Sequence, residues 1–263
     1  SNDAEKIRLA IQGAMRNPAQ ANNVKAMHLD LWSSASSTWI EPQELKACVD
    51  TSLTIDQMHG YPCWIGLDTA SHRDLASMVI LFTKDIDGKK HYYAFAKNYQ
   101  PEAQVNRPEN THLQKWAAEG HLTVTHGASI EFERIESDAL EWLTRYRVQE
   151  ICFDESHGGL GLVQRLNAAT GVTQVATPQQ IMVVSPAMRE IESAVGDGRF
   201  HYDGDPIITW CFSNILTSVT GNGLYRMPSK EHPENKIDTA MAIFFATYRA
   251  LLSTPIAKKK SVY

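Results

Sequence analysis

Cysteines and long hydrophobic runs are scarce in this sequence. The cysteines are far apart and form no C-x-x-C pair, so neither a zinc site nor a disulfide framework is indicated; they are Cys48, Cys63, Cys152 and Cys211. No apolar run approaches the roughly 18 residues of a membrane helix, and the first residues lack the apolar core of a signal peptide. We therefore expect a protein of a reducing cytoplasm that makes no membrane contact.

Several catalytic and nucleotide-binding motifs are also missing. Without a Gly-x-x-x-x-Gly-Lys-Ser/Thr sequence we expect no ATP site in this chain, and no Gly-x-Ser-x-Gly motif is present. The formal net charge of -5 argues against binding nucleic acid through bulk positive charge, although it leaves room for a local basic groove. The dense basic run at 258–260 is typical of a solvated tail.

The residues that are present suit an ordinary globular protein. A chain of 263 residues, 43% of them hydrophobic, can form one large domain that carries an appendage. Apolar residues at helical spacing predict a helix over residues 4–15, and a proline near its start favours another over 42–49. We interpret residues 1–60 as a short helical appendage or linker and residues 61–263 as the main domain.

The main domain begins with strands and continues with alternating units. Strand-like runs are predicted at 63–67, 76–82 and 91–97, with a hairpin signal at 84–89. Further strands are predicted at 122–125, 150–154 and 171–175, and helices at 129–147, 161–169, 178–195, 206–217 and 236–252. A three-stranded antiparallel meander followed by βα units makes a mixed α/β sheet flanked by helices. Trp116, Trp142 and Trp210 lie in apolar patterns and are expected in the core.

Three aspartates occupy positions that favour a metal site. Asp68 ends the first predicted strand, Asp154 ends a later one, and Asp238 opens the last predicted helix. Ligands gather at the carboxyl ends of strands in open α/β sheets, and carboxylates that meet there repel unless a cation lies between them. Hard divalent cations take such oxygen ligands, and two of them can promote phosphodiester hydrolysis. Each aspartate could equally be a turn former or a helix cap.

The sequence around these aspartates resembles that of phage terminase large subunits of the HK97 type, a group of nucleases with an RNase H-like fold. Gly-Leu-Asp-Thr-Ala-Ser at 66–71, followed by Asp-Leu-Ala-Ser at 74–77, resembles their first nuclease motif. The stretches at 116–122 and 125–127 resemble the segment before their second motif. Their closing section is similar to residues 185–188, Asp205-Pro206 with Trp210 and Asn214, 228–230 and 236–238. The likeness extends from about residue 20, with Leu31-Trp32, to residue 250.

This resemblance implies a function, a cofactor and partners. Asp68, Asp154 and Asp238 would be the catalytic, metal-binding triad of an RNase H-like endonuclease that uses two Mg²⁺ or Mn²⁺ ions. Its substrate would be concatemeric double-stranded viral DNA, cut during genome packaging in the cytoplasm of an infected or lysogenic bacterial host. In the full assembly the partners would be an ATPase motor domain, the portal ring and the small terminase subunit.

The sequence also departs from that family and leaves accessory roles open. Asp154 is followed by Glu155-Ser156-His157 where the family often has an aromatic or small residue, so Glu155 or His157 could join the site. Asp74 could hold a metal-bound water or a basic partner, or cap an element. Lys230 and Lys236 could contact DNA phosphates. Because the P-loop motor is missing, we expect this chain to be the C-terminal nuclease portion.

Two alternatives to a terminase nuclease stay open from the sequence. One is a transposase, resolvase or exonuclease of the same RNase H-like type, which would need its own DNA-recognition module. The other is a non-catalytic docking module of a packaging machine.

Overall fold

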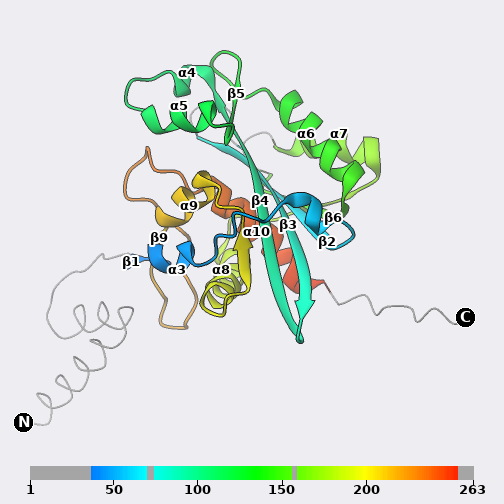
Figure 1. The fold of residues 1–263 in the computed structure, drawn as a ribbon, viewed down its shortest axis with the longest axis vertical. Coiled ribbons are helices and arrows are strands. Elements are labelled where there is room, and N and C mark those ends of the chain that lie inside the picture. Colours follow the sequence, from blue (N-terminus) through cyan, green and yellow to red (C-terminus); the bar gives the residue numbers. More distant parts are fainter. Residues whose placement is uncertain (1–36, 70–73, 156–158, 254–263) are drawn as a thin grey trace, which may run out of the picture.

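The computed structural model describes residues 37–69, 74–155 and 159–253, and seven of their strands form one mixed sheet (Figure 1). The strand order is β5-β4-β3-β2-β6-β7, and β8 pairs with β4 outside that path. Their bounds are β2 (Pro62–Asp68), β3 (Ala76–Ile86), β4 (Lys89–Pro101), β5 (Leu122–Thr125), β6 (Arg147–Phe153), β7 (Thr173–Ala176) and β8 (Phe200–Tyr202). The predicted mixed α/β sheet flanked by helices is confirmed.

The meander of β2, β3 and β4 forms where the sequence predicts it. Both neighbouring pairs are antiparallel. The β3–β4 hairpin turns at Asp87 (φ 51) and Gly88 (φ 76). Two successive residues with positive φ make the tight turn that matches the twist of paired strands, which is why Asp-Gly is a hairpin signal. The two strands continue beyond the predicted limits as far as this turn.

The later strands and helices form the predicted βα units. Strand β5 runs parallel to β4, β6 parallel to β2, and β7 parallel to β6. The helices are α6 (Phe132–Arg145), α7 (Gly159–Thr170), α8 (Ile181–Gly196), α9 (Pro206–Ser213) and α10 (Asp238–Leu252). Among the described helices, none combines the length and apolar character that crossing a membrane requires.

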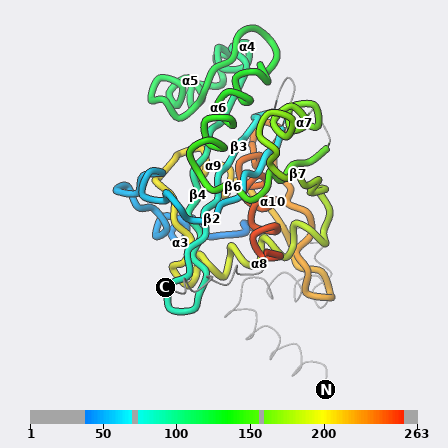
Figure 2. The backbone as a smooth tube through the Cα atoms, turned by 90° about the vertical axis from the view of Figure 1, so that its right-hand side faces the viewer, coloured from blue at the N-terminus to red at the C-terminus, as the bar shows by residue number. Residues whose placement is uncertain are grey.

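Helices cover both faces of the sheet, and two hydrophobic cores result. Along β2, Trp64 belongs to one core while Ile65 and Leu67 belong to the other, because successive side chains point to opposite faces. Helices α8, α9 and α10 contribute to the Trp64 core, and α6 and α7 to the other. Figure 1 shows α6 and α7 together on one side of the strands and α8 and α9 on the other. In Figure 2, α4 and α5 lie at the opposite end of the molecule from α8.

Several short elements were not predicted. They are α4 (Glu102–Val105), α5 (Thr111–Ala118), a 3-10 turn (Ile55–Met58), β8, and the pair β1 (Ser37–Thr38) and β9 (Leu216–Thr217). The prediction of one helix over 206–217 was wrong at its end, because α9 stops at Ser213 and Leu216 pairs with Thr38 instead. Apart from α5, which has eight residues, these elements have two to four residues and are too short to display a hydrophobic period.

The described part of the segment predicted as an appendage packs into both cores. Trp39, Ile40 and Leu45 join the core under α10, whereas Leu53 and Met58 join the other. The helix predicted at 42–49 is α3 (Pro42–Lys46), and the one predicted at 4–15 lies outside the described residues. The boundary at residue 60 stays a prediction.

Candidate metal centre

The sheet places Asp68 and Asp154 side by side. Asp68 is the last residue of β2, and Asp154 directly follows β6. The two strands are parallel neighbours, with Leu67 opposite Phe153, so the two aspartates leave the sheet at the same edge. Asp68 is 8% exposed. Asp68 therefore ends an otherwise apolar strand next to a second carboxylate and not inside either hydrophobic core.

Helix α10 brings the third aspartate to this edge. Asp238 is its first residue, as the sequence predicts. The helix backbone lies directly against β2 at Gly66, where a Cβ atom would stand 1.9 Å from the Ala242 carbonyl oxygen. Ala242 is one turn beyond Asp238, and Gly66 is two residues before Asp68. The missing side chain at Gly66 is thus what lets α10 approach the strand closely enough to reach the site.

A buried polar cluster fixes the start of α10 on the sheet. Ser77 Oγ and Thr239 Oγ1 are 3.0 Å apart, and each donates to Asn98 Oδ1 at 2.8 Å. Ser77 is on β3 opposite Asp68, Asn98 is on β4, and Thr239 follows Asp238. Because buried hydroxyls cost free energy unless they are hydrogen-bonded, this cluster favours one position of the helix.

The three carboxylates act on one another through their charge. Burial, followed by the charges of Asp238, Asp154 and Asp74, raises the pKa of Asp68 well above its usual range. Burial and the charge of Asp74 raise the pKa of Asp238 to about 6, although Lys230 and Lys236 oppose the shift. Asp238 Oδ2 is buried and has no hydrogen-bond partner among the described residues.

This donor set fits a hard divalent cation. All its donors are carboxylate oxygens, which Mg²⁺ and Mn²⁺ prefer. A cation would also satisfy the unpaired Asp238 Oδ2 and offset the repulsion that, after burial, raises the pKa of Asp68. In their present arrangement, however, no three His, Cys, Asp or Glu side chains within 37–69, 74–155 and 159–253 form a group ready to hold a metal ion. Binding would have to draw the carboxylates closer together.

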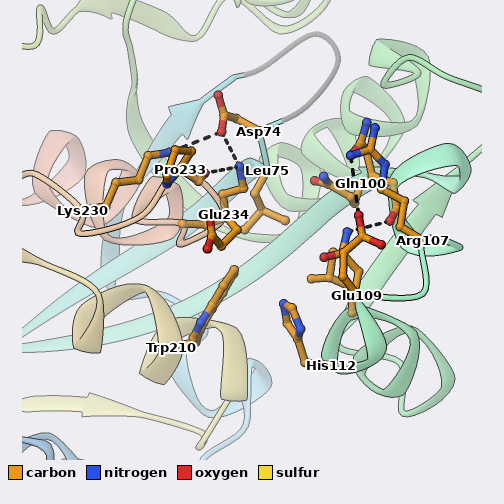
Figure 3. A pocket seen from close by; sticks show the side chains of 14 residues that line it. Asp74, Leu75, Gln100, Arg107, Glu109, His112, Trp210, Lys230, Pro233 and Glu234 are labelled. Atoms are coloured by element: carbon orange, nitrogen blue, oxygen red, sulfur yellow. Dashed lines mark hydrogen bonds and ion pairs between the residues drawn. The ribbon is translucent and has the colours of Figure 1, made fainter.

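Asp74 pairs with both lysines that were predicted to contact DNA. Lys236 Nζ donates a short hydrogen bond to Asp74 Oδ1, and Lys230 Nζ lies 3.4 Å from the same oxygen (Figure 3). Burial works against ionisation of Asp74, but the hydrogen bond and charge of Lys236, with Lys230, still lower its pKa. Of the roles left open for Asp74, the structure shows that of a basic residue's partner. The side chain of Lys230 is 29% exposed and that of Lys236 is 12% exposed.

Comparison with known proteins adds to this geometry. Residues 1–254 match the family described as terminase large subunit, endonuclease domain. The chain belongs to this family of terminase nuclease domains. It is 38% identical over 250 residues to Protein YmfN of Escherichia coli K12, a match that covers 92% of the chain and 54% of the relative. It is 23% identical over 235 residues to the terminase large subunit of Enterobacteria phage HK97, covering 88% and 45%.

A solved structure shows the same fold. The crystal structure of the HK97 bacteriophage large terminase matches with a TM-score of 0.70 and 21% identity, over 91% of this chain and 49% of that one. The predicted RNase H-like terminase fold is thereby confirmed. This terminase nuclease domain spans about half the length of the relatives it matches.

The roles of Glu155 and His157 as accessory residues stay predictions. Glu155 is exposed. His157 lies outside the described residues, as does the rest of the segment 156–158. If β6 continued, Glu155 would point to the opposite face from Asp154, which favours Asp154 in the site. The strand ends at Phe153, however, so the role of either residue in the terminase nuclease domain stays a prediction.

The structure adds residues that the sequence did not single out. Thr69 Oγ1 is buried and has no hydrogen-bond partner in the described part of the chain. A Cβ atom on Gly159, the first residue of α7, would meet Thr69 Oγ1 at 2.9 Å and the Asp154 carbonyl oxygen at 3.3 Å. The start of α7 in this terminase domain therefore lies against both strand ends. The one sequence signal for this close approach of α7 is the Gly-Gly pair that follows His157.

Proposed function

We propose that this chain is the nuclease portion of a terminase large subunit and hydrolyses DNA phosphodiester bonds with the help of divalent metal ions. The observation that carries the proposal is the meeting of Asp68, Asp154 and Asp238 at one sheet edge. Asp68 is buried there among like charges, and Asp238 Oδ2 lacks a partner among the described residues. Such an arrangement is costly for folding alone and is expected where a cation binds.

Each residue has a distinct part in the proposed reaction. Asp68 and Asp154 would hold Mg²⁺ or Mn²⁺ from the sheet, and Asp238 would complete the set from α10. When bound, two such ions supply positive charge at the attacking and leaving oxygens of the phosphodiester. Lys230 and Lys236 would contact neighbouring phosphates, which favours binding without reading the sequence. Asp74 would hold both lysines in place, since it already pairs with them.

The proposed substrate is concatemeric double-stranded viral DNA, cut when a genome is packaged. Family membership and the likeness to a phage terminase large subunit support this. The site of action would be the cytoplasm of an infected or lysogenic bacterial host. Because the relatives are about twice as long as the chain, we place the ATPase motor domain in the remaining part of such a protein. The portal ring and the small terminase subunit would be further partners.

A non-catalytic docking module is the second candidate. The observation that favours it is that the acidic side chains of the described residues form no ready three-ligand group. In that case the aspartates would bind no metal, the domain would not cut DNA, and added metal would leave its stability unchanged.

Nicking of supercoiled plasmid tests the proposal. The protein would be assayed with EDTA, Mg²⁺ and Mn²⁺ in turn, alongside Asp68→Asn, Asp154→Asn and Asp238→Asn. Asp87→Asn is the matched control, because it makes the same change in the β3–β4 turn, where asparagine also tolerates positive φ. We expect metal-dependent nicking that the first three variants lose and the control keeps. Nicking that survives in Asp68→Asn would assign the activity elsewhere, and no nicking by any form would favour the docking module.

A further inference from the structure

A cavity of about 370 Å³ opens beside the lysines that Asp74 holds. It lies between the segment 230–236, helix α9 and the α4–α5 region, and its volume is within the range of small-molecule sites. Figure 3 shows Trp210 and His112 on one side of it, with Asp74 and Lys230 across from them. Asp74 links the cavity to the candidate metal centre, because it lines the cavity and its charge acts on Asp68 and Asp238, whereas the opposite wall is aromatic.

Two aromatic rings, those of His112 and Trp210, line that wall, and Trp116, which does not line the cavity, packs against both. His112 and Trp116 on α5 have ring centroids 5.1 Å apart, and each lies 5.2 Å from the ring of Trp210 on α9. Trp116 and Trp210, which were predicted in the core, are half-buried and pack against the core that contains Trp64, whereas Trp142 is buried as predicted. His112 Nε2 has no hydrogen-bond partner among the described residues. Such a wall can stack a flat ring.

The charges around the cavity are balanced. Asp74 pairs with Lys230 and Lys236, and Arg107 lies 4.0 Å from Glu109. A site with this balance has little net positive charge with which to hold a free polyanion, although the ammonium groups of Lys230 and Lys236 each keep a further donor for a phosphate. It suits a neutral aromatic group whose attached phosphates can reach the two lysines at the rim.

We propose that this cavity takes one unpaired nucleobase of the DNA strand, stacked on Trp210, while the flanking phosphates lie at Lys230 and Lys236. The inference rests on the proposed nuclease function, because DNA is the substrate that would bring a base and phosphates together beside the aspartates. It adds to that function a preference for DNA in which a base next to the cut is already unstacked.

Binding to a fluorescent base tests the proposal without any cutting. The probe is a strand of about twelve thymidines with a single central 2-aminopurine, a length within the range of single-stranded sites, titrated in EDTA. We expect 2-aminopurine fluorescence to fall as the strand binds, and to stay unchanged when the same base is paired inside a duplex. Free dAMP should compete only at concentrations far above those of the strand. Unchanged fluorescence of the bound strand would overturn the proposal, and equal affinity for dAMP would reassign the cavity to free nucleotides.

Variants then locate the base. Trp210→Ala should weaken strand binding about 5- to 150-fold, which corresponds to the ~1–3 kcal/mol of one stacked base, and should abolish the fluorescence change. Trp210→Phe should keep part of both and guards against a variant that fails to fold. Trp142→Phe, on the other face of the sheet, is the control and should bind like the wild type. A Trp210→Phe protein with unaltered binding and quenching would contradict the stacking.

Failure of this inference can be told apart from failure of the proposed function. Asp68→Asn should lose metal-dependent nicking yet keep the fluorescence change, because Asp68 does not line the cavity. Quenching that vanishes in Asp68→Asn, although the protein still melts cooperatively, would contradict a separate base site.

Discussion

Replacing Gly66 with alanine should disturb both the stability and the activity of the domain through one contact. The new Cβ atom would stand 1.9 Å from the Ala242 carbonyl oxygen and 2.8 Å from its carbonyl carbon. A carbon and an oxygen normally stay about 3.3 Å apart or more, so α10 and β2 must separate by about 1.4 Å. The two Ala242 atoms belong to the backbone of α10, and the Cβ atom is fixed to the backbone of β2, so neither side can rotate away from the clash. We therefore expect the upper end of an overpacking penalty, about 3 kcal/mol, and a fall in Tm of roughly 6–12 °C.

The same displacement should reduce nicking more than the loss of folded protein explains. Asp238 is carried on the helix that moves, and misplacing a catalytic group by about 1 Å can cost on the order of 100-fold in rate. The assays are thermal denaturation and plasmid nicking below the Tm of the variant. Gly196→Ala is the control, because a Cβ atom at that end of α8 meets nothing within 4 Å.

Two results would refute this reasoning. A Gly66→Ala protein that melts like the wild type would mean that the helix does not lie against the strand at this point. A destabilised protein with full nicking activity would mean that Asp238 does not depend on the position of α10. The double variant with Ala242→Gly should bring no rescue, because the clash is with the carbonyl group and not with the methyl group.

Three further predictions concern buried polar groups. Asp68→Asn should raise stability in EDTA by about 1–3 kcal/mol while it abolishes metal-dependent nicking, because it removes a buried charge among like charges; a lower Tm in EDTA would contradict this. Thr239→Val should cost about 0.5–1.5 kcal/mol in urea denaturation because Asn98 Oδ1 loses one of the two hydrogen bonds that it accepts, whereas Thr144→Val, at an exposed hydroxyl, should cost little. Burial raises the pKa of Asp205 to about 6 from 3.8. Between these pH values the folded state therefore binds more protons than the unfolded state. The free energy of unfolding should accordingly fall by up to about 3 kcal/mol as the pH rises from 4 to 6. Asp205→Asn keeps the cap on Ile207 and Ile208, and urea denaturation across that range should show a shallower fall; an unchanged slope would contradict the assignment.

The elements with a clear period or turn signal could be predicted from the sequence. The apolar run before Asp68, the Asp-Gly turn at 87–88 and the long amphipathic helices α6 and α8 all appear where local pattern places them. Elements without such a signal could not be predicted. Leu216 illustrates this, because it lies within an apolar run typical of a helix and yet pairs with Thr38 from the far end of the described chain.

The sequence alone determined where the three aspartates stand along the chain. A carboxylate at a strand end or a helix start is a local feature, and so is the motif around Asp68 that resembles the terminase family. Only the tertiary structure decided how these residues meet. The approach of α10 depends on the empty space at Gly66, and the pairing of Asp74 with Lys236 joins residues that are far apart in sequence. The wall of Trp210 and His112 likewise forms between two helices that no local period relates, because contacts between distant segments are fixed by packing and not by pattern.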